Sequence, residues 1–253
     1  MSFGTAFRKE WLEQLRSYRL LVTAVVLTLF GLLSPLIARY TPDIIRMALP
    51  QGEEILKLIP PPSAADSVAQ YLKNITQFGV LLALLMAMGL VAQEKDKGTA
   101  ALMLSKPIGR PVFLLAKFAS LALTFTLSIA LAGAAGYYYT LVLFGAMDLG
   151  AWLGLNVMVL VFLLVYVSLT LLCSTLTKSQ VLAGGLATGV WMALSLMGAL
   201  PGLGDYSPRQ VIGWATALGT GMAQTYWPAL GVSLALIVGG LAGACAIFNR
   251  QEL

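Results

Sequence analysis

Residues 74–93, NITQFGVLLALLMAMGLVAQ, form an unbroken uncharged run, and the charged stretch EKDKG at 94–98 follows it directly. A run of about 20 mostly apolar residues is long enough to cross a bilayer as a helix. Charges at its end mark the membrane surface. Five more uncharged runs are long enough for one such helix each: Leu20–Ala38, Phe118–Met147, Leu149–Thr177, Ser179–Gly204 and Gln210–Asn249.

The sequence therefore predicts an all-α polytopic membrane protein with six transmembrane helices, in which residues 1–253 form a single transmembrane domain. The expected spans lie near 20–38, 74–93, 112–144, 151–175, 180–200 and 228–248. Composition agrees: 58% of the 253 residues are hydrophobic and 11% are charged. A soluble domain is about 25% charged.

The chain contains no histidine, which excludes histidine-based zinc sites and Ser-His or Cys-His nucleophile pairs. Cys173 and Cys245 lie inside apolar runs and predict buried thiols rather than a disulfide. We therefore expect a membrane subunit that is not an enzyme, with no catalytic residues, no metal site and no cofactor of its own. Transport, conduction and scaffolding remain as functions.

Basic residues set the expected orientation. With six spans and an inner N-terminus, eleven of the 16 Lys and Arg residues fall on the inner side and five on the outer side. The segment 94–117 alone holds five of them. Basic residues concentrate on the cytoplasmic side, so we predict a multi-pass protein of the plasma or inner cell membrane with both termini cytoplasmic.

The segment before the first span, residues 1–19, has the pattern of an amphipathic helix. Its apolar residues recur every three or four positions: Phe3, Phe7, Trp11, Leu15 and Tyr18. Lys9, Glu13 and Arg16 occupy the other face. Such a helix lies in the headgroup plane with its aromatic residues in lipid, so we expect an interfacial elbow helix. A surface that contacts a cytoplasmic partner is the alternative.

Two outer segments are expected between spans. Residues 39–73 contain Pro42, Pro50 and Pro60-Pro61-Pro62, which predict a mostly solvated connection, with short helices between the prolines. Ser207-Pro208-Arg209-Gln210 has the pattern of a helix start, with serine as the N-cap. It predicts an outer interfacial helix that ends near Gly219 and Gly221.

The segment between spans two and three, residues 94–110, carries the most specific pattern. We expect span two to continue as a charged helix until Gly98, a left-handed helix stop. Thr99 can then cap a short helix over 100–105 whose Leu102 and Met103 are apolar outside the bilayer, and Pro107 ends it. Docking into the groove of another protein and lying on the membrane surface are both compatible with this local pattern.

This segment resembles the ABC-2 family, the membrane-spanning permease subunits of ATP-binding-cassette exporters. The matching residues are Glu94, Gly98-Thr99, Leu102, Leu104, Ser105, Pro107, Arg110 and Lys117. Six spans, an N-terminal amphipathic helix and a helical segment before span six agree with that family in layout.

The resemblance implies a homodimer paired with two copies of a separate ABC ATPase subunit, which would bind ATP and Mg. It implies membrane lipid as the other partner of this chain and no nucleic acid. Residues 94–110 would form the coupling segment. Glu94 would lie where span two meets the ATPase, Leu102 and Met103 would fill the ATPase groove, and Lys106 and Arg110 would contact its surface charges. The chain has no G-x-x-x-x-G-K-[ST] phosphate loop, so ATP must be hydrolysed by a partner.

The spans themselves indicate the cargo. No charged residue lies in the middle of any expected span, which argues against an ion-coupled carrier and favours a hydrophobic or amphiphilic substrate. Weak polar candidates for a translocation surface are Thr76, Gln77, Asn156, Tyr166, Thr188 and Ser195. Gly185 and Gly189 are spaced for close helix packing, within one chain or across a homodimer.

The function expected is export powered by the partner ATPase. The alternative is a non-transporting scaffold or mechanotransmission subunit, of the kind that serves copper-enzyme maturation, docking a cytoplasmic partner through residues 94–110.

Overall fold

The computed structural model describes residues 3–48, 53, 56, 60–99 and 109–251, and in these residues it is all-helical. The helices are α1 (Phe3–Arg16), α2 (Arg19–Ala48), α4 (Ala64–Ala87), α5 (Ala92–Asp96), α7 (Arg110–Phe144), α8 (Leu149–Leu176), α9 (Gln180–Met197), α10 (Arg209–Thr220) and α11 (Trp227–Arg250), with a 3-10 turn, η1 (Gly204–Tyr206). Six of them, α2, α4 continued by α5, α7, α8, α9 and α11, are long and apolar enough to span a membrane. The six predicted spans are confirmed.

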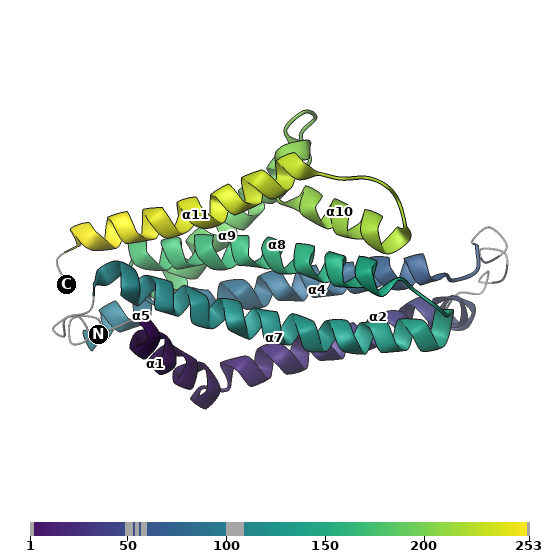
Figure 1. Cartoon of the computed structure of the whole chain (residues 1–253), viewed down its shortest axis with the longest axis horizontal. Coiled ribbons are helices and arrows are strands. Elements are labelled where there is room, and N and C mark those ends of the chain that lie inside the picture. Colours follow the sequence, from purple (N-terminus) through teal and green to yellow (C-terminus); the bar gives the residue numbers. More distant parts are fainter. Residues whose placement is uncertain (1–2, 49–52, 54–55, 57–59, 100–108, 252–253) are drawn as a thin grey trace.

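Both chain ends lie at the same end of the bundle, together with α1 and α5 (Figure 1). We call this the proximal end and the opposite one the distal end. An even number of antiparallel spans requires this arrangement.

The predicted connection over 39–73 is wrong at both ends, because helices enter it from each side. α2 runs on to Ala48 with Pro42 inside it. α4 starts at Ala64, where the Ser63 backbone N–H donates to the Asp66 carboxylate over 2.8 Å. This contact is half of a capping box, which satisfies an N–H that the helix start leaves free. Pro60–Pro62 are outside the helices, as predicted.

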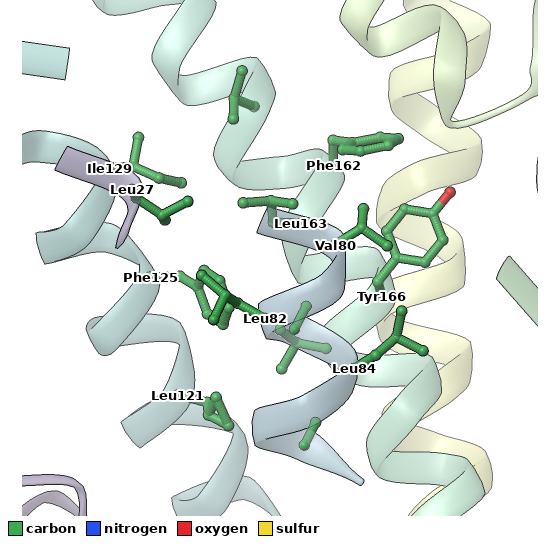
Figure 2. Packing of buried hydrophobic residues seen from close by; sticks show 14 of the residues in the cluster. Leu27, Val80, Leu82, Leu84, Leu121, Phe125, Ile129, Phe162, Leu163 and Tyr166 are labelled. Carbon is green, nitrogen blue, oxygen red and sulfur yellow. The ribbon is translucent and has the colours of Figure 1, made fainter. Parts of the chain in front are cut away.

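The core lies between α2, α4, α7 and α8. Figure 2 shows Phe125 and Leu121 of α7 directed toward Leu82 of α4, with Leu163 of α8 close by. α2 and α7 approach so closely that a Cβ atom on Gly31 would lie 2.5 Å from the Ala132 carbonyl oxygen. Backbones can meet at this distance only where one of them has no side chain, so Gly31 fixes the packing of α2 on α7.

α9 and α11 pack on this core from one side only. Within the most apolar window, 11% of α9 and 17% of α11 is buried, against 61% for α4 with α5 and 61% for α8. A Cβ atom on Gly185 or Gly189 would meet nothing within 4 Å, whereas one on Gly184 would lie 2.8 Å from the Met88 Sδ. Packing within the chain therefore uses Gly184, and not the predicted glycine pair.

α10 covers the distal half of α8 and α4, where it buries Val211, Trp214 and Ala215 (Figure 1). The predicted helix is present, starting two residues after Ser207, whose Oγ accepts the Arg209 N–H over 3.3 Å. It ends at Gly221, which has a left-handed φ of 73°. The apolar face of α10 thus lies on the protein itself.

Candidate functional site

The N-terminal helix α1 packs against α7 through its polar face. Ala6, Glu10 and Gln14, spaced by four residues, are buried. Phe3 and Leu15 are exposed on the other side, where Phe7 stacks between Phe3 and Trp11. The aromatic face thus points away from the bundle, which agrees with the predicted membrane interface of Phe3, Phe7, Trp11 and Leu15; contact with lipid itself stays a prediction.

Four charged side chains from three helices meet behind α1, and we call them the ionic cluster: Lys9, Glu10, Glu94 and Lys117. The Lys117 Nζ lies 3.0 Å from the Glu10 Oε2 and 2.7 Å from the Glu94 Oε1. The Lys9 Nζ lies 3.0 Å from the Glu10 Oε1 and 3.6 Å from the Glu94 Oε1. The cluster joins α1, α5 and α7 at the proximal end.

Burial makes the ionic cluster a tightly held unit. The Lys117 side chain is 1% exposed and that of Glu10 is 4% exposed, and the Lys117 ammonium also lies 4.8 Å from the centre of the Phe113 ring. Burial alone would raise the pKa of the Glu10 carboxyl. Lys117 and Lys9 outweigh that effect and hold the Glu10 pKa below its ordinary value. Two cations and two anions balance, which makes burial of these charges tolerable.

The carboxylates of Glu10, Glu13 and Glu94 also bring oxygen atoms within 4.8 Å of one another, a spacing that a metal ion could use. Lys9 and Lys117 already neutralise them, and Lys9 also lies 3.7 Å from Glu13. The donor set therefore fits an ion-paired structural cluster better than a metal site.

Sequence reasoning missed Glu10 and the pairing of Lys117. The amphipathic pattern predicts that the aromatic face of residues 1–19 lies in lipid, but it assigns the polar face no partner within the chain. In a membrane, lipid is apolar too, so the polar face turns inward. Lys117 is the one charge in the expected span 112–144 and was the available signal.

The predicted charged extension of span two up to Gly98 is present as α5, but a turn at residues 88–91 interrupts the helix between α4 and α5. The Ser174 Oγ of α8 accepts the N–H groups of Val91 and Ala92 over 3.1 and 3.0 Å and donates to the Met88 carbonyl over 2.8 Å. One hydroxyl thus satisfies three backbone groups that the interrupted helix leaves free.

The end of α11 is tied to α5, α7 and α8. The Lys95 Nζ donates to the Thr175 carbonyl over 2.8 Å and to the Gln251 Oε1 over 3.2 Å. The Arg110 Nη1 donates to the carbonyls of Phe248, Asn249 and Gln251 over 2.8–2.9 Å. These are the carbonyls that a helix C-terminus leaves without partners, so Arg110 caps α11.

The predicted coupling residues fall into two groups. Leu102, Met103, Lys106 and Pro107 lie outside the described residues. Gly98 has the expected left-handed φ of 68°, the Thr99 Oγ1 donates to the Glu94 carbonyl over 3.2 Å, and Pro111 sits in the first turn of α7. The side chains of Glu94 and Arg110 contact Lys117 and the end of α11 within the chain. Their contacts with an ATPase stay a prediction.

Four of the six predicted translocation residues share one open cavity of about 450 Å³ beside α4: Thr76, Gln77, Tyr166 and Ser195. Thr188 lines an adjoining cavity of about 490 Å³, which Gln77 also lines. Asn156 lies elsewhere: its Oδ1 accepts the Tyr71 hydroxyl over 2.6 Å, and its Nδ2 donates to the Trp152 carbonyl. Asn156 therefore has a structural place in the core.

Comparison with known proteins agrees with this architecture. A family model described as ABC-2 family transporter protein matches residues 5–210. The chain is also similar to the uncharacterized transmembrane protein YxlG of Bacillus subtilis, with 29% identity over 193 residues, which cover 74% of this chain and 73% of the relative. The match to the family model covers the ionic cluster and every residue that lines the two cavities beside α4 except Ile212 and Thr216.

Proposed function

Because this chain belongs to the ABC-2 transporter family, we propose that it is the membrane-spanning permease subunit of an ABC exporter. It couples ATP hydrolysis by a separate nucleotide-binding subunit to export of a hydrophobic or amphiphilic substrate. The working complex is a homodimer with two ATPase copies, which carry the ATP and Mg. The proximal end faces the cytoplasm, across the plasma or inner membrane.

The observation that carries the coupling role is the ionic cluster. Glu94 lies on α5, the last described helix before residues 100–108, and it binds Lys117 of α7 and, through Lys117, Glu10 of α1. A displacement of α5 therefore pulls on two further helices through short buried ion pairs. Buried pairs are costly to separate, so α1, α5 and α7 are expected to move together.

A second set of contacts carries the same displacement to α8 and α11. Ser174 holds the turn before α5, Lys95 binds the end of α8, and Arg110 binds the end of α11. Movement of residues 98–109 by a partner would thus reach four spans at one end of the bundle. This arrangement suits a subunit that receives force from outside its own chain.

Co-expression with the ATPase encoded nearest to this chain tests the proposal. We expect the ATPase to co-purify, and its hydrolysis rate to change on assembly. For the variants Glu94→Gln and Leu102→Asp we expect the ATPase still to co-purify, in equal or smaller amount. Its hydrolysis rate should then stay the same on assembly. Asp96→Asn is the matched control, since Asp96 is an exposed carboxylate two residues along the same helix.

Two outcomes would contradict the proposal. If no neighbouring ATPase co-purifies, the chain acts as a scaffold instead. If the complex forms and both variants keep full coupling, force enters by a different route.

A further inference from the structure

The two cavities beside α4 adjoin each other and together make a groove along this helix. The cavity of about 450 Å³ lies between α4, α8, α9 and α10, the cavity of about 490 Å³ lies between α4 and α9, and both are lined by Gln77, Val80 and Trp191. We call this the α4–α9 groove. Figure 2 shows Val80 and Leu84 of α4 and Tyr166 of α8, which line it.

The groove changes character along its length. Lys73 and Arg209 line the distal cavity, and no acidic residue lines either cavity among the described residues. The proximal cavity has no charged lining residue and is walled mainly by apolar side chains such as Leu81, Leu85 and Met88. A cationic end followed by an apolar trough is the complement of an anionic amphiphile.

The two cations have no partner in the described part of the chain. Neither Lys73 nor Arg209 makes an ion pair with a described residue. Asp66 lines a neighbouring cavity together with Lys73, but its carboxylate accepts the Ser63 N–H at the start of α4. Asp205 lines another cavity together with Arg209 and makes no ion pair with a described residue. The side chains of Lys73 and Arg209 are both exposed, so they are free to pair with an anionic headgroup.

Tyr166 gives a second, independent sign of a ligand. Its side chain is 4% exposed and lines the groove, yet its hydroxyl makes no hydrogen bond to any described residue. In Figure 2 the hydroxyl points away from the Leu121 and Phe125 side of the core. This hydroxyl is free to donate to an oxygen of a molecule bound in the groove.

We propose that the α4–α9 groove binds an anionic amphiphile, with its charged headgroup at Lys73 and Arg209 and its acyl chain along Leu81, Leu85 and Met88. This names the substrate class of the permease and rests on the proposed function. Lys73 and Met88 are 15 residues apart, about 22 Å along a helix, against about 15 Å for half the hydrocarbon core. The groove is therefore long enough for an extended acyl chain.

Binding is tested on the purified chain in neutral detergent, without any ATPase. The probes are phosphatidylglycerol and phosphatidylcholine with identical dibrominated acyl chains, which quench nearby tryptophans. Trp191 lines the groove, and Trp191→Phe identifies its share of the fluorescence. We expect phosphatidylglycerol to quench Trp191 at about one tenth of the phosphatidylcholine concentration, since two basic groups favour the anionic headgroup.

Variants separate the groove from general lipid contact. Lys73→Gln/Arg209→Gln is expected to remove the tenfold preference while phosphatidylcholine still quenches. Arg46→Gln, which removes an exposed distal cation outside the groove, is expected to keep it. Inorganic phosphate, added as a competitor, distinguishes a site for a free anion from a site for a lipid headgroup. We expect millimolar phosphate not to protect Trp191 from quenching by brominated phosphatidylglycerol.

Equal quenching by both lipids, or a preference that survives in the double variant, would overturn the proposal. Protection by inorganic phosphate alone would make the site one for a small anion. If the double variant does not fold, competition decides: dodecyl sulfate should displace the brominated lipid from the unmodified chain, and dodecyltrimethylammonium should not. Because no ATPase is present, this result stands apart from the co-purification test.

Discussion

The proximal end and the α9–α11 side of the molecule are built in opposite ways. At the proximal end, buried ion pairs and side-chain contacts to backbone carbonyls join α1, α5, α7, α8 and α11. On the other side, α9 is 11% buried and leaves a long groove against α4. Polar contacts cost most to break where water is scarce, so the proximal end resists deformation and the loosely packed side is free to adapt. Each variant below breaks or sharpens this contrast.

The largest effect is expected from Lys117→Met. It removes the nearest cation from the buried Glu10 and the half-buried Glu94 and leaves them only the more exposed Lys9, and removal of one partner from a buried pair costs about 3–5 kcal/mol. Thermal unfolding in detergent measures the loss, with the exposed Lys178→Met as control. The triple variant Glu10→Gln/Glu94→Gln/Lys117→Met should recover part of it, since no charge is then left unpaired. Equal stability of Lys117→Met and Lys178→Met would show that the cluster is not a structural tie.

Glycine substitutions compare the packed core with the open side directly. Gly31→Ala forces α2 away from the Ala132 carbonyl and should cost about 1–3 kcal/mol. Gly185→Ala/Gly189→Ala meets open space and should instead gain about 0.5–1 kcal/mol per site, because alanine restricts the unfolded chain. Unfolding of the monomer gives both values. A loss in the second variant that appears together with loss of the dimer would place the homodimer contact on this face of α9.

Ser174→Ala tests the turn between α4 and α5. It removes the hydroxyl shared by Met88, Val91 and Ala92 and should cost about 1–2 kcal/mol, near the upper end for a cross-helix hydrogen bond in a membrane protein. Thr126→Val is the control, because the Thr126 hydroxyl bonds only within its own helix. Hydrogen exchange at Val91 and Ala92 should rise in Ser174→Ala alone. Unchanged protection there would mean that the turn holds itself.

The smallest effect is expected from acid. The Glu10 pKa is lowered in the folded chain, so the Glu10 ion pairs contribute fully above the unfolded pKa of about 4.3 and are lost as pH falls through the lowered folded pKa. The stability difference between the unmodified chain and Glu10→Gln should be constant from pH 7 to 5. Below about pH 4 it should shrink. If the stability difference between the unmodified chain and Glu10→Gln grows on acidification, the Glu10 pKa is raised in the folded chain and not lowered.

Much of the fold follows from the sequence because transmembrane helices can be recognised by the length and hydropathy of their uncharged runs. The six spans, the left-handed Gly98 and the place of Pro111 in the first turn of α7 could all be predicted in this way. The ends of α2 and α4 could not, since Pro42 is tolerated inside an exposed helix and the Ser63–Asp66 cap was not recognised.

The candidate site was predictable only in part. Thr76 and Gln77 of α4, Tyr166 of α8 and Ser195 of α9 do gather in one cavity, because the packing of three helices brings their polar residues together. The ionic cluster depends on contacts between residues 107 positions apart, Glu10 and Lys117, and no local pattern encodes such a pairing.

The Arg110 cap also bears on how the chain is made. Arg110 emerges from the ribosome well before its acceptors at Phe248, Asn249 and Gln251, and the bond spans 138 to 141 positions. The cap on α11 can therefore form only after four more spans have been translated and the last of these carbonyls has been synthesised. Attachment of α11 to the proximal end is thus a late event of biogenesis, and a nascent chain halted before residue 248 would hold most of its membrane helices and the ionic cluster without this tie.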